Sequence, residues 1–392
     1  MEELNMQNLS YFGFPTRIWF GPHVLEEKLP EIILKEKYGK ALLLTDPGFS
    51  KTNSFKKITQ TLEHAKVPFT IFSEVHGNPT EKDVLAGVAT YKNNQCNWIL
   101  GVGGGSPLDV AKAVRLMATH PGSILDYDET IGGTDKITSH IPPFVAIPTT
   151  SGTGSEVGRS SVITDVKTKT KKIIFSPHLL ANWVIADPTL TVDLPAHITA
   201  ATGMDALTHN IESYLAKGFH PMADGIALEG IKLVVKYLKR ACENPQDIEA
   251  RGGMLMASMM GAVAFQKGLG VTHSLAHPLS TLAGLHHGLS NGVMLVPAMK
   301  FNESACKDRL TEVSRAIYSA LGQSQSPSSS AALAYLDELC TEIQIPKKLS
   351  AIGVQASLLE HLVEQAVHDP CYASNPKPVT RADFEKLYRE AL

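Results

Sequence analysis

The sequence predicts two domains, an α/β domain built on a parallel sheet followed by an all-helical domain. Up to about residue 190, short β-rich runs alternate with helical patterns, which is the order of elements in βαβ units. From about residue 195, long helical patterns take over and no strand-like run competes with them. A length of 392 residues allows two domains, each large enough to bury its own core.

Five apolar runs are expected to form the parallel sheet: 41–45 (ALLLT), 69–72 (FTIF), 98–103 (WILGVG), 144–148 (FVAIP) and 183–187 (WVIAD). Farther along, 223–241 and 252–266 are expected to be helices, and the serine-rich segment 324–330 is expected to be a surface loop. Two prolines punctuate residues 187–195. We therefore expect a dinucleotide-binding domain at 1–190 and a helical metal-binding domain at 191–392.

Composition excludes several classes of protein. A net charge of −3 gives no general attraction for nucleic acid or anionic membrane, and the basic run 167–172 is expected to be a solvated turn. No apolar stretch reaches the roughly 18 residues of a membrane span, and residues 1–10 do not resemble a signal peptide. Five scattered cysteines without CxxC spacing suit a reducing compartment. We expect a cytoplasmic protein without nucleic-acid or membrane partners.

Two i,i+4 pairs in the second half carry the strongest chemical signal. Asp205 and His209 lie in GMDALTHNIES, and His273 and His277 lie in GVTHSLAHPLS. If both stretches are helical, each pair projects from one face of its helix toward a common point. A carboxylate and several imidazoles at one point suit a borderline divalent metal, with iron(II) and zinc as the leading candidates. A single helical histidine is usually a surface or core residue, but this combination predicts a metalloenzyme.

A further histidine pair follows in LHHGLSNG. His286 and His287 are neighbours, so they point in different directions on any regular backbone and at most one is expected to bind the metal. The sequence alone leaves open which of the two it is.

Two small-residue loops follow predicted strands. In the first, Gly103, Gly104 and Gly105 precede a helix for which Ser106 is the expected N-cap, Pro107 the first residue and Asp109 the capping acid. Backbone N–H groups at such a helix start can bind phosphate, although a tight strand-to-helix turn explains the pattern equally well.

The second loop, TTSGTGSE at 149–156, offers hydroxyls and glycines after the strand at 144–148. Two such loops at the carboxyl ends of parallel strands favour a ligand crevice over flexible connectors. Asp46 ends the strand at 41–45, where its carboxylate can accept hydrogen bonds from a ribose or cap a turn.

Several long segments, in the same order, resemble the signatures of the iron-containing (group III) alcohol dehydrogenase family. They are GGGSPLDVAKAV, PTTSGTGSE, GMDALTHNIESY and HSLAHPLSTLAGLHHGLSNG, with FPTRIWFG near the start and DPCYASNPKP near the end. The resemblance implies a Rossmann-like N-terminal domain, a helical C-terminal domain, and a cleft between them that holds NAD(P) and a metal. It also implies metal-dependent hydride transfer between nicotinamide and a small alcohol or aldehyde, by a homo-oligomer of two or more chains.

The same resemblance assigns residues to roles. It places the metal on Asp205, His209, His273 and His287, and it makes His277 the non-ligand histidine beside the reacting alcohol. It assigns the cofactor to NAD, with NADP the less favoured choice, through Asp46, which is associated with that preference. The remaining cofactor-binding residues that it implies are Asn78, Gly103, Gly104, Gly105, Ser106, Thr149, Thr150, Ser155, Ser160 and Lys171.

Departures from the family pattern concern the substrate. Ser280 stands where many relatives have glycine, and Arg159 follows the second loop where uncharged side chains are common. If Arg159 faces the substrate, an acid-bearing aldehyde is expected; the alternative is that it points to solvent or pairs with a structural acid. Two other functions are compatible with this organisation: a dehydroquinate-synthase-like lyase that also uses a metal and NAD, and a non-enzymatic nucleotide-binding protein. The metal-region motifs favour the dehydrogenase.

Overall fold

The computed structural model describes residues 12–13 and 16–392. The expectation about a signal peptide at residues 1–10 and the first two residues of FPTRIWFG lie outside the described residues. Two compact units form, one from residues 16–195 and 245–255 and the other from residues 12–13, 196–244 and 256–392.

The first unit contains a six-stranded parallel sheet in the order β1-β8-β5-β4-β2-β3. Its strands are β1 (Arg17–Phe20), β2 (Ala41–Leu44), β3 (Phe69–Phe72), β4 (Trp98–Gly103), β5 (Phe144–Pro148) and β8 (Trp183–Ala186). The five predicted strands are confirmed with bounds that agree to within one residue. The sequence analysis misses β1, a short strand at the sheet edge whose side chains are mostly exposed.

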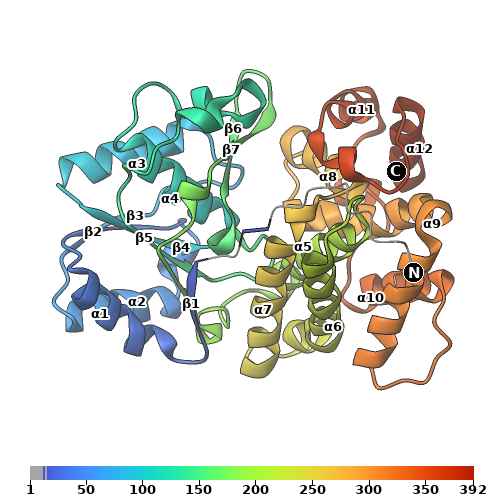
Figure 1. The fold of residues 1–392 in the computed structure, drawn as a ribbon, viewed down its shortest axis with the longest axis horizontal. Coiled ribbons are helices and arrows are strands. Elements are labelled where there is room, and N and C mark those ends of the chain that lie inside the picture. Colours follow the sequence, from blue (N-terminus) through green and yellow to red (C-terminus); the bar gives the residue numbers. More distant parts are fainter. Residues whose placement is uncertain (1–11, 14–15) are drawn as a thin grey trace. The chain divides into compact units, whose positions relative to one another are not determined.

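Helices cover both faces of this sheet. They are α1 (Val24–Glu36), α2 (Asn53–His64), α3 (Glu81–Asn93) and α4 (Gly105–Met117). In Figure 1, α1 and α2 lie on one face and α3 and α4 lie on the other. The apolar side chains of α1, including Leu25 and Leu29, pack with Leu43, Leu100 and Ile147 of the sheet in one buried core. The strands β2, β4, β5 and β8 are fully buried, as expected for nearly continuous apolar strands with helices on both faces.

An antiparallel hairpin, β6 (Ser160–Asp165) and β7 (Thr170–Phe175), accompanies the sheet. The prediction that 167–172 is a solvated turn is therefore wrong for its second half, which begins β7. The Asp165 carboxylate closes the turn by accepting hydrogen bonds from Lys167 N at 2.8 Å and Thr168 Oγ1 at 2.9 Å. Lys172 is held in the strand by an ion pair with Asp128 at 3.1 Å.

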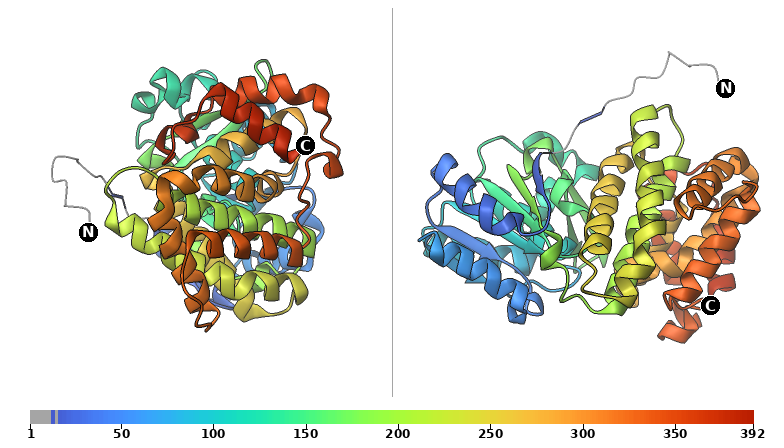
Figure 2. Two further views of the ribbon diagram at one scale, coloured as in Figure 1. Left: turned by 90° about the vertical axis from the view of Figure 1, so that its right-hand side faces the viewer. Right: turned by 90° about the horizontal axis from the view of Figure 1, so that it is seen from below.

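The second unit is mostly helical. Its helices are α5 (Ala196–Leu215), α6 (Pro221–Glu243), the second part of α7 (Ile248–Ala264), α8 (Val271–Leu282), α9 (His287–Ala320), α10 (Ser329–Glu342), α11 (Leu359–Val367) and α12 (Arg381–Ala391). Both predicted helices are present, and the serine-rich loop separates α9 from α10. Helix α5 packs against both α6 and α9, and Figure 2 shows these helices from two further sides. Every residue of α5 from Thr199 to Leu215 is buried, so its polar side chains are held inside the unit.

Among the described residues, no single helix has the length and apolar character to cross a membrane, although the bent pair Ile248–Lys267 and Val271–Leu282 reaches both criteria together.

Candidate active site

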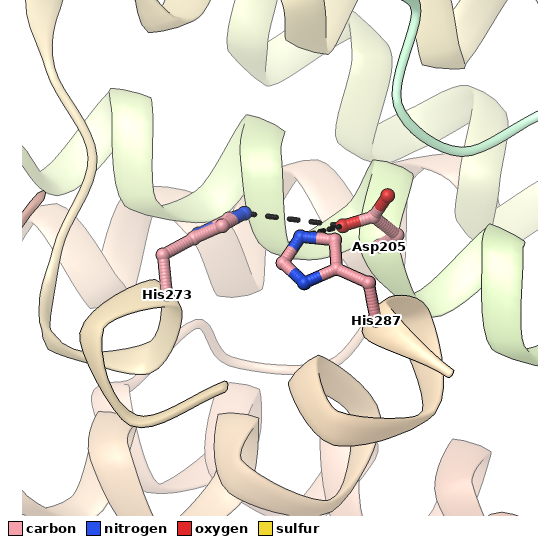
Figure 3. Close-up of side chains that lie close together, drawn as sticks. All are labelled: Asp205, His273 and His287. Atoms are coloured by element: carbon pink, nitrogen blue, oxygen red, sulfur yellow. Dashed lines mark ion pairs between the residues drawn. The ribbon is translucent and has the colours of Figure 1, made fainter. Parts of the chain in front are cut away.

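In the helical unit, three histidine side chains approach one carboxylate oxygen of Asp205. Asp205 and His209 lie one turn apart on α5, and Asp205 Oδ1 is 3.9 Å from His209 Nε2. The Nε2 atoms of His273 on α8 and His287 on α9 lie 3.8 Å and 3.6 Å from the same oxygen. Figure 3 shows the last two imidazoles approaching Asp205, and the donor atoms of these three residues all lie within 4.8 Å of one another. The structure thus brings together the four predicted metal ligands, of which Asp205, His273 and His287 form the mutually close group and His209 adjoins it at Asp205.

This donor set fits a metal ion. Ligand atoms of a tetrahedral ion with bonds of about 2.1 Å are about 3.4 Å apart, close to the 3.6–3.9 Å separations from Asp205 Oδ1. Asp205, His209 and His273 are each at most 3% exposed, and His287 is partly exposed. One carboxylate with three imidazoles is a donor set for Fe²⁺ or Zn²⁺ rather than for Mg²⁺ or Ca²⁺.

The start of α9 decides between the two adjacent histidines. His287 approaches Asp205, whereas His286 is the exposed N-cap residue. Gly288 permits this arrangement, because a Cβ atom there would lie 2.2 Å from Ala201 O on α5. The first turn of α9 can therefore rest directly on α5, with His287 facing the cluster.

Glu212 fixes the orientation of His273. Its carboxylate is buried and lies 2.7 Å from His273 Nδ1, and it also accepts hydrogen bonds from the backbone N–H groups of Gly270 and Thr272. Burial alone would raise the pKa of Glu212, but its hydrogen bonds with His273 and Thr272 hold that pKa below its ordinary value. A charged Glu212 keeps the proton on Nδ1 and leaves Nε2 to face Asp205. Sequence reasoning missed Glu212, although it continues the helical face of Asp205 and His209 at i+7.

Asn291 was also missed. It is fully buried one turn after His287, and its Nδ2 donates a hydrogen bond to Asp205 Oδ1 at 2.7 Å. The same nitrogen lies 3.3 Å from His273 Nε2 and 3.2 Å from His287 Nε2. Asn291 therefore orients the carboxylate from a position next to the candidate ligand atoms.

His277 is held apart from this cluster by a different acid. Its Nδ1 lies 2.6 Å from Asp369 Oδ2, and its ring stacks on His287 with centroids 5.2 Å apart. Burial alone would raise the pKa of Asp369, but the charge and hydrogen bond of His277 hold it well below its ordinary value. The charged carboxylate favours the His277 tautomer with a proton on Nδ1, so Nε2 is the atom that can accept another proton. Asp369 was not predicted from the sequence.

The two predicted cofactor loops contact each other in the sheet unit. A Cβ atom on Gly104 would lie 2.9 Å from Thr150 Oγ1, and one on Gly105 would lie 2.7 Å from Thr153 Oγ1. Larger residues at these glycines would push the loops apart. The glycines thus let the hydroxyl-rich segment pack directly against the start of α4. Backbone N–H groups beside hydroxyls are an arrangement suited to a phosphate-bearing ligand.

Comparison with known proteins agrees with both halves of this description. The sequence-family model of the iron-containing alcohol dehydrogenases matches residues 15–188. The model of the C-terminal part of the same family matches residues 199–392. The chain belongs to the iron-containing alcohol dehydrogenase family. The predicted family, fold class and enzyme class are confirmed, and the match to both halves favours a dehydrogenase over a dehydroquinate-synthase-like lyase.

Individual members of the iron-containing alcohol dehydrogenase family extend the match. The chain is 37% identical to a 4-hydroxybutyrate dehydrogenase of Cupriavidus necator, over 90% of this chain and 92% of that protein. A crystal structure of 1,3-propanediol oxidoreductase superposes with a TM-score of 0.91 at 33% identity, covering 98% of this chain and all of that one. Sulfoacetaldehyde reductase from Bifidobacterium kashiwanohense, in complex with NAD⁺, superposes with a TM-score of 0.87 at 29% identity, covering 98% and 99% of the two chains.

Within this iron-containing alcohol dehydrogenase fold, Asp46 caps a turn. Its Oδ1 accepts hydrogen bonds from Gly48 N and Phe49 N, both at 2.9 Å. Its Oδ2 lies 3.5 Å from the position of a Cβ atom on Gly103, whose carbonyl accepts a hydrogen bond from Thr149 N. Asp46 therefore combines the turn-capping role with a position beside the glycine loop.

Ser155 is tied to α4 by a buried ionic network. Its hydroxyl donates to Asp109 Oδ1 at 2.6 Å and accepts from Lys112 Nζ at 2.8 Å. Lys112, which is fully buried, also donates to Ser160 O at 2.7 Å. Burial raises the pKa of Asp109 and lowers that of Lys112, and the charge of each partner offsets part of the other's shift. The Ser155 hydroxyl thus anchors the second cofactor loop to α4.

This network corrects the predicted cap of α4. Gly104, in an extended conformation, is the N-cap, and Ser106 and Pro107 lie inside the first turn. Proline is tolerated there because the first N–H groups of a helix have no partner within it. The acid expected to complete a capping box, Asp109, turns to Ser155 instead.

Two predicted cofactor residues lie on other segments. Asn78 precedes α3 with a positive φ of 52°, and Lys171 lies on β7 opposite Thr164 of β6.

Proposed function

We propose that this protein transfers hydride between NAD and a small alcohol or aldehyde at a metal ion bound by Asp205, His209, His273 and His287. The observation that carries the proposal is the convergence of three imidazole Nε2 atoms within 3.6–3.9 Å of one buried carboxylate oxygen. A bound Fe²⁺ or Zn²⁺ supplies the Lewis acidity that stabilises negative charge on the substrate oxygen.

Neighbouring residues orient the proposed metal ligands. Glu212 keeps His273 in the tautomer with Nε2 unprotonated, and Asn291 holds the Asp205 carboxylate. Nearly complete burial of Asp205 and His273 limits the access of water, which strengthens the electrostatic interactions at this position.

His277 is proposed to move the alcohol proton. Asp369 holds its Nδ1 proton, so Nε2 can take up a proton released by an alcohol and pass it toward solvent. Its side chain is 19% exposed, which gives this route an outlet. An imidazole is suited to the role because its ordinary pKa lies near neutrality.

NAD is proposed as the nicotinamide cofactor, with pyrophosphate at Gly103–Ser106 and further contacts from Thr149 and Thr150. Asp46 supports NAD over NADP, because a carboxylate beside the glycine loop would repel a 2′-phosphate. The sulfoacetaldehyde reductase with the same fold binds NAD⁺, which agrees with this choice.

The test is a spectrophotometric screen for NADH formation and consumption. The purified protein, loaded separately with iron(II) or zinc, would be offered linear alcohols, diols, hydroxy acids and their aldehydes, each with NAD(H) and with NADP(H). Turnover of at least one alcohol–aldehyde pair, faster with NAD(H), is expected. Tight NAD binding without hydride transfer to any member of the panel would contradict the proposal.

For the substrate, we propose an acid-bearing aldehyde such as a short semialdehyde. Two relatives, the 4-hydroxybutyrate dehydrogenase and the sulfoacetaldehyde reductase, are named for compounds with an acidic group. Arg159 is the candidate cation, and it is partly buried just after the second cofactor loop. Its guanidinium lies 5.3 Å above the Phe175 ring, which supports the side chain against β7.

Arg159→Ala distinguishes this role from a structural one. Wild type should prefer succinic semialdehyde to butanal in kcat/KM, and Arg159→Ala should lose that preference while retaining activity on butanal. Lys167→Ala, which removes an exposed cation from the same hairpin, is the matched control and should keep the preference. A preference that survives Arg159→Ala would leave a broad alcohol dehydrogenase.

The cytoplasmic location and the homo-oligomer remain predictions. The absence of a disulfide among the five cysteines supports a reducing compartment.

A further inference from the structure

A second group of metal-binding side chains lies beside the first. His277, Asp369 and Cys371 each offer one donor atom, and these three atoms lie within 4.8 Å of one another. The group contains a thiol, which the set around Asp205 lacks. Its three members come from α8 and from the segment that starts the short helix η11 (Pro370–Ser374), 92 residues farther along the chain.

Hydrogen bonds hold this group in place. Asp369 Oδ2 lies 2.6 Å from His277 Nδ1, and its Oδ1 accepts from Ser274 Oγ at 2.8 Å and from the backbone N–H of Cys371 at 2.9 Å. The acid is therefore fixed between the imidazole and the residue that carries the thiol. A ligand set that is already ordered loses little entropy when it binds an ion.

Solvent can reach the group. The side chains of His277 and Asp369 are 19% and 12% exposed, and Cys371 is partly buried. In the first set, Asp205 and His273 are at most 2% exposed, whereas the side chain of His287 is 23% exposed. An ion from solution therefore has direct access to the thiol-containing group.

The types of donor atom in this group indicate which metal ion it would bind. One imidazole, one carboxylate and one thiolate provide three ligands for a four-coordinate ion whose fourth position is taken by water. The thiolate disfavours Mg²⁺ and Ca²⁺ and favours Zn²⁺ among common divalent ions. Because the thiol must lose its proton to bind, zinc affinity should rise with pH.

We propose that His277, Asp369 and Cys371 form a second metal site, at which Zn²⁺ inhibits the enzyme. Zinc bound there replaces the proton on His277 Nδ1 that Asp369 holds, and this proton leaves to solvent. The proton that the neutral ring keeps then lies on Nε2, so His277 can no longer accept the alcohol proton. The inhibition rests on the proposed function of His277, whereas zinc binding to the three side chains does not.

Cobalt(II) tests binding without any use of activity. A cobalt–thiolate bond gives a near-ultraviolet charge-transfer band. The first site, formed by Asp205 and three histidines, contains no sulfur and cannot give this band. Wild type should bind a second equivalent of Co²⁺ with appearance of this band, and Zn²⁺ should abolish it. Cys371→Ala should bind one equivalent without the band, and Cys242→Ala, which removes another partly buried thiol, should behave like wild type. A band that persists in Cys371→Ala, or saturation of wild type at one equivalent, would overturn the site.

Zinc titration of the iron-loaded enzyme tests the inhibition, with metal content measured throughout to detect exchange at the first site. The turnover of Cys371→Ala without zinc is the reference for its inhibition, and the variant keeps the backbone N–H that binds Asp369. The zinc concentration for half inhibition should rise at least about tenfold in Cys371→Ala, since even changes outside the ligand shell weaken metal affinity by roughly that factor. Equal inhibition of both proteins would overturn the regulatory role. Failure of the proposed function would look different, since the cobalt band would appear in a protein that oxidises no alcohol.

Discussion

Lys112→Met should destabilise the sheet unit, because it leaves a buried carboxylate without its cation. Lys112 Nζ lies 3.7 Å from Asp109 Oδ1 and also donates hydrogen bonds to Ser155 and Ser160. Methionine fills a similar volume but provides no charge and no donor. Asp109 would keep its hydrogen bonds from Ser155 Oγ and from Val162 N.

The magnitude follows from the two ways in which Asp109 can respond. Leaving one partner of a buried ion pair charged costs about 3–5 kcal/mol. Taking up a proton at pH 7, for a carboxyl whose ordinary pKa is 3.8, costs about 4 kcal/mol at about 1.4 kcal/mol per pH unit. Asp109 adopts whichever of these two states has the lower free energy, so the free energy of unfolding should fall by about 3–4 kcal/mol at pH 7.

The loss should also depend on pH. Without Lys112, the pKa of Asp109 in the folded protein rises further above its value in the unfolded chain. The resulting penalty is present above the unfolded pKa and diminishes as the pH falls toward it, so it should be smaller at pH 5 than at pH 7.

Urea denaturation of four proteins at both pH values provides the assay. Wild type is compared with Lys112→Met, with Asp109→Asn and with the double variant, which no longer has the Asp109 carboxylate without its cation and should be more stable than Lys112→Met alone. A loss below about 1 kcal/mol at pH 7, or the same loss at pH 5, would refute the reasoning that a coupled buried pair anchors the loop.

Three further predictions concern the active site. Glu212→Gln should weaken metal affinity roughly 10–100-fold, because the His273 imidazole loses its anionic partner; chelator competition measures this, and unchanged affinity would remove Glu212 from the site. His277→Ala should retain the metal at the Asp205 site but lose roughly 10²–10⁴-fold in the rate of the proton-transfer step, whereas loss of metal from that site would make His277 one of its ligands. Asp46→Gly should shift the ratio of kcat/KM values toward NADP, since it removes a carboxylate beside the glycine loop; an unchanged ratio would leave Asp46 as a turn cap only.

Much of the fold could be predicted because its signals are local. Five strands are continuous apolar runs between helical patterns, and each was located to within one residue. The missed elements lack that signal. Strand β1 is four residues long with mostly exposed side chains, and the first half of β7 contains two lysines, of which Lys172 pairs with the distant Asp128. Contacts so distant in sequence leave no local periodicity.

The residues of the active site also fall into those that a local sequence pattern predicts and those that it does not. The spacing of Asp205 and His209 indicated one helix face, and the same spacing, extended by one turn, would have found Glu212. Asp369 could not be found in this manner, because it meets His277 from a segment 92 residues away. Residue preference predicts Ser106 as the cap of α4, but the helix starts two positions earlier, after Gly104, and the acid expected to complete the capping box bonds Ser155 instead.

Metal-dependent hydride transfer is tested most directly by titrating the chelator-treated protein with iron(II) and, separately, with zinc, while NADH formation from an alcohol substrate is followed. Wild type should regain turnover in proportion to metal bound at the Asp205 site and reach full turnover at one ion per chain there. His273→Ala should bind no metal at that site and should form no NADH, yet it should still bind NAD. Turnover by the metal-free wild type, or a His273→Ala variant with normal metal content and rate, would contradict the account.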